Sequence, residues 1–330
     1  GPVLQTEWPP DLPIPSTSAH VNLLRRATSL VLRAKLEFCL LEGISASTGE
    51  PIRIAVAGDS RLRALVRQIA SIPDASETLL ARAAPLHVAR SRVESDLLVV
   101  SANRLLSRRF ARQGFRLVPA WVRTFLAISA DTERFYAGLG SSAREDLRKV
   151  RTRGYSCRFV TDSKRLESFY REMYAPYARS RYGESAVVHR LGELRRQFDD
   201  GGLLVVSKEG APVIAMLVRV QDRLLRCSAL GVADGDHAHL RGGGSAAIYC
   251  AAVEWAGSRG CRGIDFGHSR AFLSDGVLRY KLKWGMTVFE DDDAVNDLAL
   301  KPLTDRGEQF LEANPCYRLE DVRPAVPTAG

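Results

Sequence analysis

Short apolar segments, separated by turn residues, follow one another along most of this chain. Segments rich in Val, Ile and Leu predict β-strands at residues 51–58, 96–101, 155–160, 203–207, 213–220, 224–232 and 263–267, with a last extended piece at 287–290. Apolar residues at helical spacing predict α-helices at residues 20–41, 60–72, 104–114, 163–179, 188–198, 245–258 and 273–284. Strands and helices mixed in this way predict an α/β fold.

Tight turns join three of the predicted strands in the second half of the chain. Glu209-Gly210 separates residues 203–207 from 213–220, and Gln221-Asp222 leads into residues 224–232. Connections this short join antiparallel neighbours. The later strand, 263–267, follows the helix at 245–258. We therefore expect a mixed sheet in this half.

The length of 330 residues favours two domains. We expect a flexible, proline-rich N-terminal arm at residues 1–20 and a first domain at 21–153. The helix that closes the first domain begins with the capping box Ser142-x-x-Glu145 and ends at Gly154. A second domain then covers residues 154–290. Residues 291–330 form an extension that we expect to pack back on the first domain, and the acidic run 290–293 is expected at the surface.

Composition narrows the class of protein. Hydrophobic residues make up 45% and charged residues 26%, as in globular proteins. No apolar run reaches the ~20 residues that a membrane-spanning helix needs. The first residues lack the pattern of a signal peptide. The six cysteines have no metal-ligand spacing, so we expect a cytoplasmic protein without a metal site.

The net charge of +9 comes mainly from arginine, and two clusters stand out. Their members are Arg104, Arg108, Arg109, Arg112 and Arg116, and then Arg144, Arg148, Lys149, Arg151 and Arg153. Such clusters bind the phosphates of a nucleic acid or a cofactor, or they are simply solvated helix faces.

A glycine-rich turn stands between the strand at 224–232 and the helix at 245–258: Arg241-Gly242-Gly243-Gly244-Ser245-Ala246. Backbone N–H groups and the helix dipole favour an anion at the start of a helix, and glycines let a phosphate approach the main chain. The turn has neither G-x-G-x-x-G nor Gly-Lys-Ser/Thr, which excludes the Rossmann and P-loop motifs. It predicts a phosphorylated ligand.

The same turn, at Arg241-x-x-Gly244-x-Ala246, matches the Q/R-x-x-G-x-G/A pattern of the GNAT superfamily of acyltransferases, which this half of the chain resembles. Three downstream segments are similar to the Fem-like and CelD-like branch of that superfamily: residues 265–270, Asp275-Gly276 and Tyr280-Lys281-x-x-Trp284-Gly285. The resemblance implies two GNAT-like domains in tandem, the first degenerate.

The resemblance also implies a reaction: transfer of an acyl group from acyl-CoA to an amine or hydroxyl of a small molecule or of a cell-envelope or polysaccharide precursor, directly in a ternary complex. The residues that it assigns to the donor are Leu230, Val232, Arg241, Gly242, Gly243, Gly244, Ser245 and Ala246. Alternatively, the donor is an aminoacyl-tRNA, as in Fem-type enzymes, or the chain is an inactive GNAT-like binding protein.

Four residues are candidates for catalysis. Lys281 matches a lysine that lies near the reacting ester in the Fem branch. His268 and Asp275 are candidate bases after a predicted strand, where ligands gather in α/β folds, although Asp275 can instead cap the next helix. Tyr280 is a candidate acid, one position away from the tyrosine of simple GNAT enzymes.

The acceptor is expected against the first helices of the second domain. Tyr174, Tyr177 and Arg181 share one helix face by their spacing and suit a polar or anionic acceptor, or else pack the helix onto the core. Arg270 and Trp284, from the segments that resemble the Fem branch, complete the predicted acceptor residues.

Overall fold

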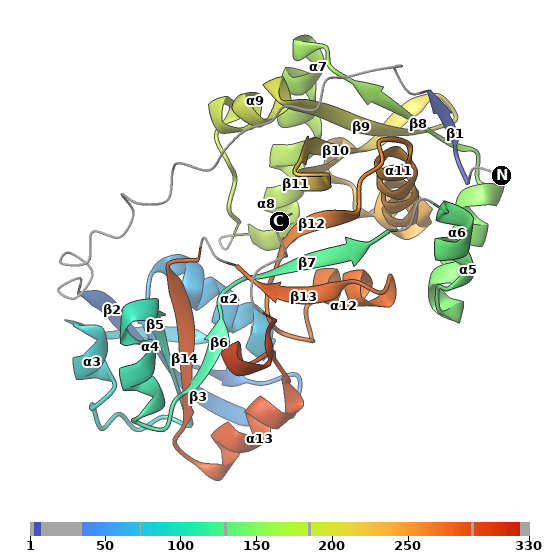
Figure 1. The fold of residues 1–330 in the computed structure, drawn as a ribbon. Coiled ribbons are helices and arrows are strands. Elements are labelled where there is room, and N and C mark those ends of the chain that lie inside the picture. Colours follow the sequence, from blue (N-terminus) through green and yellow to red (C-terminus); the bar gives the residue numbers. More distant parts are fainter. Residues whose placement is uncertain are drawn as a thin grey trace.

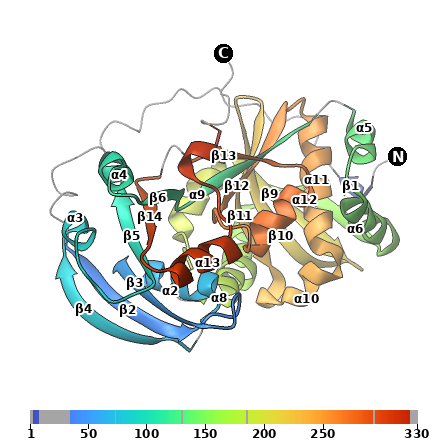
Figure 2. The ribbon, with the colours of Figure 1, turned by 90° about the horizontal axis from the view of Figure 1, so that it is seen from below.

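The computed structural model describes residues 3–7, 35–72, 74–128, 131–183, 186–291 and 294–323. Its strands form an eight-stranded and a six-stranded sheet, both mixed, which lie on opposite sides of the molecule (Figures 1 and 2). The predicted mixed α/β fold with two units is confirmed.

The six-stranded sheet has one parallel pair, β3 with β5, among otherwise antiparallel neighbours. In spatial order its strands are β4 (Ser76–Ala83), β2 (Leu36–Ile44), β3 (Pro51–Gly58), β5 (Leu97–Asn103), β14 (Asn296–Pro302) and β6 (Arg116–Pro119). The helices of this unit are α2 (Ser60–Ala70), α3 (Pro85–Val88), α4 (Arg104–Ala111) and α13 (Asp305–Ala313). Strand β14, from the C-terminal extension, lies between β5 and β6, so the end of the chain completes this sheet.

The prediction of a helix at residues 20–41 is wrong for the described residues of that range. Residues 36–41 belong to β2, which pairs with β3 on one side and β4 on the other, and residues 20–34 lie outside the described residues. Four successive side chains of β2, from Phe38 to Leu41, are buried. A strand buried on both faces shows a continuous apolar run, which single-sequence periodicity confuses with a helix.

The eight-stranded sheet contains most of the second half of the chain. In spatial order its strands are β1 (Gln5–Glu7), β8 (Tyr155–Val160), β9 (Gly201–Lys208), β10 (Ala211–Gln221), β11 (Leu224–Val232), β12 (Gly263–Ser269), β7 (Val122–Ala127) and β13 (Thr287–Glu290). Strand β7 comes from the range predicted for the first domain, and β1 comes from the predicted N-terminal arm. Among the described strands of this sheet, only the pairs β1–β8 and β11–β12 are parallel.

Helix α11 (Ser245–Ser258) is the centre of the larger core. Ten of its fourteen residues are buried, because the sheet covers one side and α5 (Thr132–Ala137) and α6 (Ser141–Thr152) cover the other (Figure 1). Its alanines, glycine and serines allow this close packing, and its apolar character on all sides is that of a buried helix. Among the described residues, no helix is long and apolar enough to span a membrane.

The helix predicted at residues 163–179 is interrupted. It divides into α7 (Ser163–Ser168), a π-helical segment, η1 (Phe169–Tyr174), and α8 (Ala175–Tyr182). Strand β11 approaches η1 so closely that a Cβ on Gly231 would lie 2.7 Å from the ring of Phe169 and 2.8 Å from the Tyr174 nitrogen. Widened turns of this kind occur often at functional sites.

Candidate functional site

Strands β11 and β12 separate along their length. They pair at only three positions, from Leu224 opposite Gly263 to Arg226 opposite Asp265. Beyond that point, residues 227–230 of β11 and 266–268 of β12 line a cavity of about 390 Å³. The edge of β11 that faces the cavity has backbone polar groups that β12 does not satisfy there.

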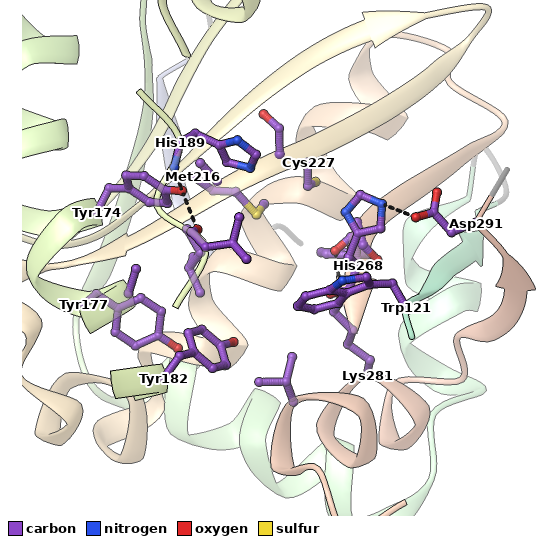
Figure 3. Close-up of a pocket in the computed structure, with 18 of the residues that line it drawn as sticks. Trp121, Tyr174, Tyr177, Tyr182, His189, Met216, Cys227, His268, Lys281 and Asp291 are labelled. Carbon is purple, nitrogen blue, oxygen red and sulfur yellow. Dashed lines mark hydrogen bonds and ion pairs between the residues drawn. The ribbon is translucent and has the colours of Figure 1, made fainter. Parts of the chain in front are cut away.

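The walls of the cavity come from elements far apart in the sequence. Figure 3 shows Tyr174, Tyr177 and Tyr182 on one side and Trp121, His268 and Lys281 on the other. The remaining lining residues are Ala178, Val187, His189, Met216, Cys227, Ser228, Ala229, Leu230, Tyr249, Phe266, Gly267, Val277 and Asp291. Mostly apolar and aromatic walls with a few polar groups are typical of a small-molecule site.

Lys281, from α12 (Gly276–Lys283), holds the end of β12 in place. Its Nζ donates to the carbonyl oxygens of Phe266 (2.8 Å), Gly267 (3.2 Å) and His268 (3.0 Å). These carbonyls lie where the pairing of β12 with β7 is irregular and where Gly267 has a φ of +69°. Three acceptors match the three N–H donors of an ammonium group. Lys281 therefore fixes the bend in β12 that opens the cavity.

The environment of Lys281 disfavours its charge. Only 4% of the residue is exposed, and this burial lowers the pKa of Lys281 to about 8, against a smaller opposite effect of the Asp265 carboxylate. Asp265 itself is held by Arg123, by Arg226 at 3.3 Å, and by the Gly267 N–H at 3.0 Å. When protonated, Lys281 is a cation fixed in the cavity wall.

His268 and Asp291 form a pair at the cavity. The His268 Nε2 lies 3.2 Å from the Asp291 Oδ2 (Figure 3). A carboxylate in this place holds the proton on Nε2 and leaves Nδ1 as the acceptor. The His268 side chain is 52% exposed, whereas that of Asp291 is 6% exposed. The prediction that the acidic run is at the surface is therefore wrong for Asp291; residues 292–293 lie outside the described residues.

Asp275 and Tyr280 lie outside the cavity lining. The Asp275 Oδ1 accepts hydrogen bonds from the Val277 N–H (2.7 Å) and the Leu278 N–H (2.9 Å), so it caps α12. The Tyr280 hydroxyl donates to Asp146 on α6 at 3.1 Å, and burial raises the pKa of Tyr280 far above its ordinary value. Of the four predicted catalytic residues, the cavity brings together Lys281 and His268.

Two of the predicted acceptor residues line the cavity. The Tyr174 hydroxyl accepts from the His189 N–H at 3.1 Å and donates to the Val187 carbonyl at 3.4 Å, which fastens the segment after α8 as one wall. Tyr177 is buried, and burial raises its pKa to about 12. Arg181, Arg270 and Trp284 are outside the lining, and Trp284 is fully buried against Tyr249.

The glycine turn lies beside the far end of β11. It is a π-helical segment, η4 (Leu240–Gly244), in which Gly243 has a φ of +110°. A Cβ on Gly244 would lie 2.5 Å from Ile214 Cδ1, and Ile214 pairs with Val232 at the end of β11. The Tyr155 hydroxyl donates to the Gly242 carbonyl at 3.0 Å.

The predicted donor residues therefore occupy three places. Leu230 lines the cavity, Val232 is buried in the core, and Arg241 to Ala246 form the turn and the start of α11. Basic groups from α6 and the residue after it adjoin the turn. A Cβ added at Gly243 would lie 3.7 Å from the Lys149 Cβ. The Arg153 Nη1 donates to the Gly242 carbonyl at 2.5 Å.

Sequence reasoning did not identify Trp121, Tyr249, His189 or Asp291 as site residues. Trp121 precedes β7 and Asp291 follows β13. Strand β7 pairs with both β12 and β13 over long sequence distances, so no local motif marks these two residues. Tyr249 lies within an apolar helix and is indistinguishable from its core neighbours by pattern. No group of three or more His, Cys, Asp or Glu side chains in the described part of the chain is arranged to hold a metal ion.

No family model and no curated protein matches the chain. Solved structures similar to it include FemX, with 10% identity over 79% of this chain and 83% of that one and a TM-score of 0.43. L-PGS from Bacillus licheniformis shares 12% identity over 85% and 88% of the two chains, with a TM-score of 0.38. A GCN5-related N-acetyltransferase from Sphaerobacter thermophilus shares 14% identity over 82% and 80%, with a TM-score of 0.36. These likenesses concern the arrangement of elements and say nothing about activity.

Proposed function

We propose that the chain is an acyltransferase that moves an acyl group from acyl-CoA to an amine or hydroxyl of a small molecule or of a cell-envelope or polysaccharide precursor. The observation that carries the proposal is the separation of β11 and β12, which opens a cavity along the edge of a strand whose far end adjoins a glycine turn. A long donor with phosphates at one end and a reactive group at the other fits such a path.

The donor would lie along the edge of β11. Its phosphates would meet the glycine turn, where Arg241, Lys149 and Arg153 supply positive charge. Its extended arm would follow the β11 backbone, whose polar groups beyond Arg226 are available for hydrogen bonds on this side. The acyl group would then enter the cavity near Ser228 and Leu230.

The chemistry would take place between the two aromatic walls. The acceptor nitrogen or oxygen attacks the thioester carbonyl, a new bond to carbon forms, the carbon–sulfur bond breaks, and coenzyme A leaves as the thiolate. His268 would accept the proton of the attacking group on Nδ1, with Asp291 stabilising the imidazolium. Lys281 contributes a positive field to the developing oxyanion without donating to it, since its three donors are occupied.

An aminoacyl-tRNA donor is the second candidate, and the basic clusters bear on it. Arg108, Arg109 and Arg112 of the first cluster are exposed. Arg104 and Arg116, however, are paired with Glu290 and Glu308. The first cluster is therefore partly neutralised within the chain, and we favour acyl-CoA.

One assay separates these proposals. The purified chain is incubated with a set of amines and alcohols and with either acetyl-CoA or charged tRNA as donor, and acylated products are sought by mass spectrometry. Acetyl-CoA-dependent products support our proposal. Transfer only from charged tRNA, abolished by ribonuclease, supports the second candidate. Saturable acetyl-CoA binding without any transfer leaves the inactive binding protein, and neither binding nor transfer contradicts all three.

A further inference from the structure

A guanidinium group lies beside the cavity without an acidic partner. The Cζ of Arg270 stands 3.6 Å above the centre of the Trp121 ring, and burial lowers the pKa of Arg270 to about 10. Within the described part of the chain, no carboxylate lies within ion-pair distance of it. A partly buried charge without a counter-charge is unfavourable, and a ligand of opposite charge would offset this cost.

The two carboxylates that raise the pKa of Arg270 both cap helices. Asp275 and Asp59 both act on Arg270 electrostatically. Asp275, however, caps α12 through the Val277 and Leu278 N–H groups, and Asp59 caps α2 by accepting from the Leu62 N–H at 2.9 Å. Their carboxylates point to helix N-termini, which leaves the five N–H donors of the guanidinium without a carboxylate acceptor.

A second arginine approaches the same place from α8. The guanidinium groups of Arg181 and Arg270 both act on the Tyr182 hydroxyl electrostatically. A Cβ added at Gly276 would lie only 3.3 Å from the Arg181 Nη2, so the absence of a side chain at Gly276 makes room for the Arg181 guanidinium at the start of α12. Two guanidinium groups thus lie around the Tyr182 hydroxyl, and Tyr182 lines the cavity.

We propose that Arg270, Arg181 and the Tyr182 hydroxyl form a subsite for an oxyanion, a carboxylate or a phosphate, carried by the acceptor. The assignment of this anion to an acceptor substrate rests on the proposed acyl transfer. Trp121 lies between the subsite and the base: Arg270 stacks on its ring, and the His268 ring packs against it with centroids 6.2 Å apart. An acceptor bound by its anion would present its other end to His268.

Anion binding is tested first without any donor. Thermal melting of the full chain is measured in inorganic phosphate and in acetate, against sodium chloride at equal ionic strength. We expect a saturable rise in Tm with at least one of the two anions. Arg270→Met and Arg181→Met should each lose it. Arg259→Met is the matched control, because Arg259 also stacks on a tryptophan, Trp255 at 5.4 Å, away from the cavity lining.

The outcomes decide the proposal. A rise with acetate alone that Arg270→Met loses assigns a carboxylate, and a rise with phosphate that Arg270→Met loses assigns a phosphate. Phosphate bound at the glycine turn would raise the Tm of Arg270→Met as much as that of the wild type. A rise that remains in this variant therefore identifies binding at the turn. No rise in either anion, or a rise that survives both substitutions, overturns the subsite.

Acyl transfer gives the second test, with acceptors that share one aminoethyl chain. β-Alanine carries a carboxylate, 2-aminoethyl phosphate a phosphate, and ethanolamine neither. With acetyl-CoA, the wild type should use the better anionic amine at least roughly tenfold more efficiently in kcat/KM than ethanolamine, as expected for a charged hydrogen bond. Arg270→Met should use the two about equally. Equal use by the wild type overturns the subsite but not the transferase, whereas Arg270-dependent anion binding without any transfer contradicts the transferase but not the subsite.

Discussion

Replacing Lys281 by Met tests how the cavity wall is built. The ammonium is buried against three carbonyl oxygens, and its pKa falls from 10.5 to about 8 on folding. Between these values the unfolded chain binds more protons than the folded one, so stability rises with pH. At 1.36 kcal/mol per pKa unit, the free energy of unfolding changes by about 3 kcal/mol between pH 8 and pH 10.5. Below pH 8 both states are protonated and this contribution is constant.

The assay is urea denaturation at several values between pH 7 and 10.5, for the wild type and Lys281→Met. The free energy of unfolding of the wild type, minus that of the variant, should rise through pH 8 to 10.5 by up to about 3 kcal/mol. Lys283→Met, which removes a lysine from the same helix that is paired with Asp146, controls for the lost charge. A difference that is flat with pH would refute the account of a desolvated Lys281.

Three further substitutions examine the site and its frame. His268→Gln should lower kcat/KM for acyl transfer by roughly 10²- to 10⁴-fold, the range for a lost general base, and an unchanged rate would remove it from catalysis. Tyr280→Phe, which removes the hydrogen bond to Asp146, should leave the rate unchanged and cost about 1 kcal/mol in denaturation; a large loss of rate would place Tyr280 in the reaction. Gly231→Ala should lower the free energy of unfolding by about 1–3 kcal/mol, because the added Cβ meets η1. Gly192→Ala, whose added Cβ has nothing within 4 Å, should be neutral or stabilising. Equal effects of the two substitutions would contradict the close packing of β11.

The sequence predicts the local elements of the second half well. Tight turns and the glycine-rich turn before residue 245 place β9, β10, β11 and α11 close to their observed bounds. Lys281 is indicated by its match to a lysine of the Fem branch, and His268 by its place directly after a predicted strand. The cap at Asp275 was open to two interpretations from sequence, and its hydrogen bonds to α12 show the structural one.

What the sequence does not predict depends on long-range pairing. The neighbours of β12 are β11 and β7, and β7 is separated from it by more than a hundred residues. That pairing brings Trp121 and Asp291 to the cavity, and it buries a carboxylate that looks like part of a solvated acidic run. Helical spacing in residues 36–41 likewise misleads, because burial on both faces of β2 replaces the alternation of a strand.

Calorimetric titration with acetyl-CoA tests the central claim, that a phosphorylated acyl donor lies along β11 between the glycine turn and the cavity. The wild type should bind one acetyl-CoA saturably. Arg241→Glu should weaken that binding by at least roughly tenfold, because it replaces an attractive charge at the turn by a repulsive one. The absence of binding to the wild type at millimolar acetyl-CoA, or equal affinity in the variant, would contradict this placement of the donor.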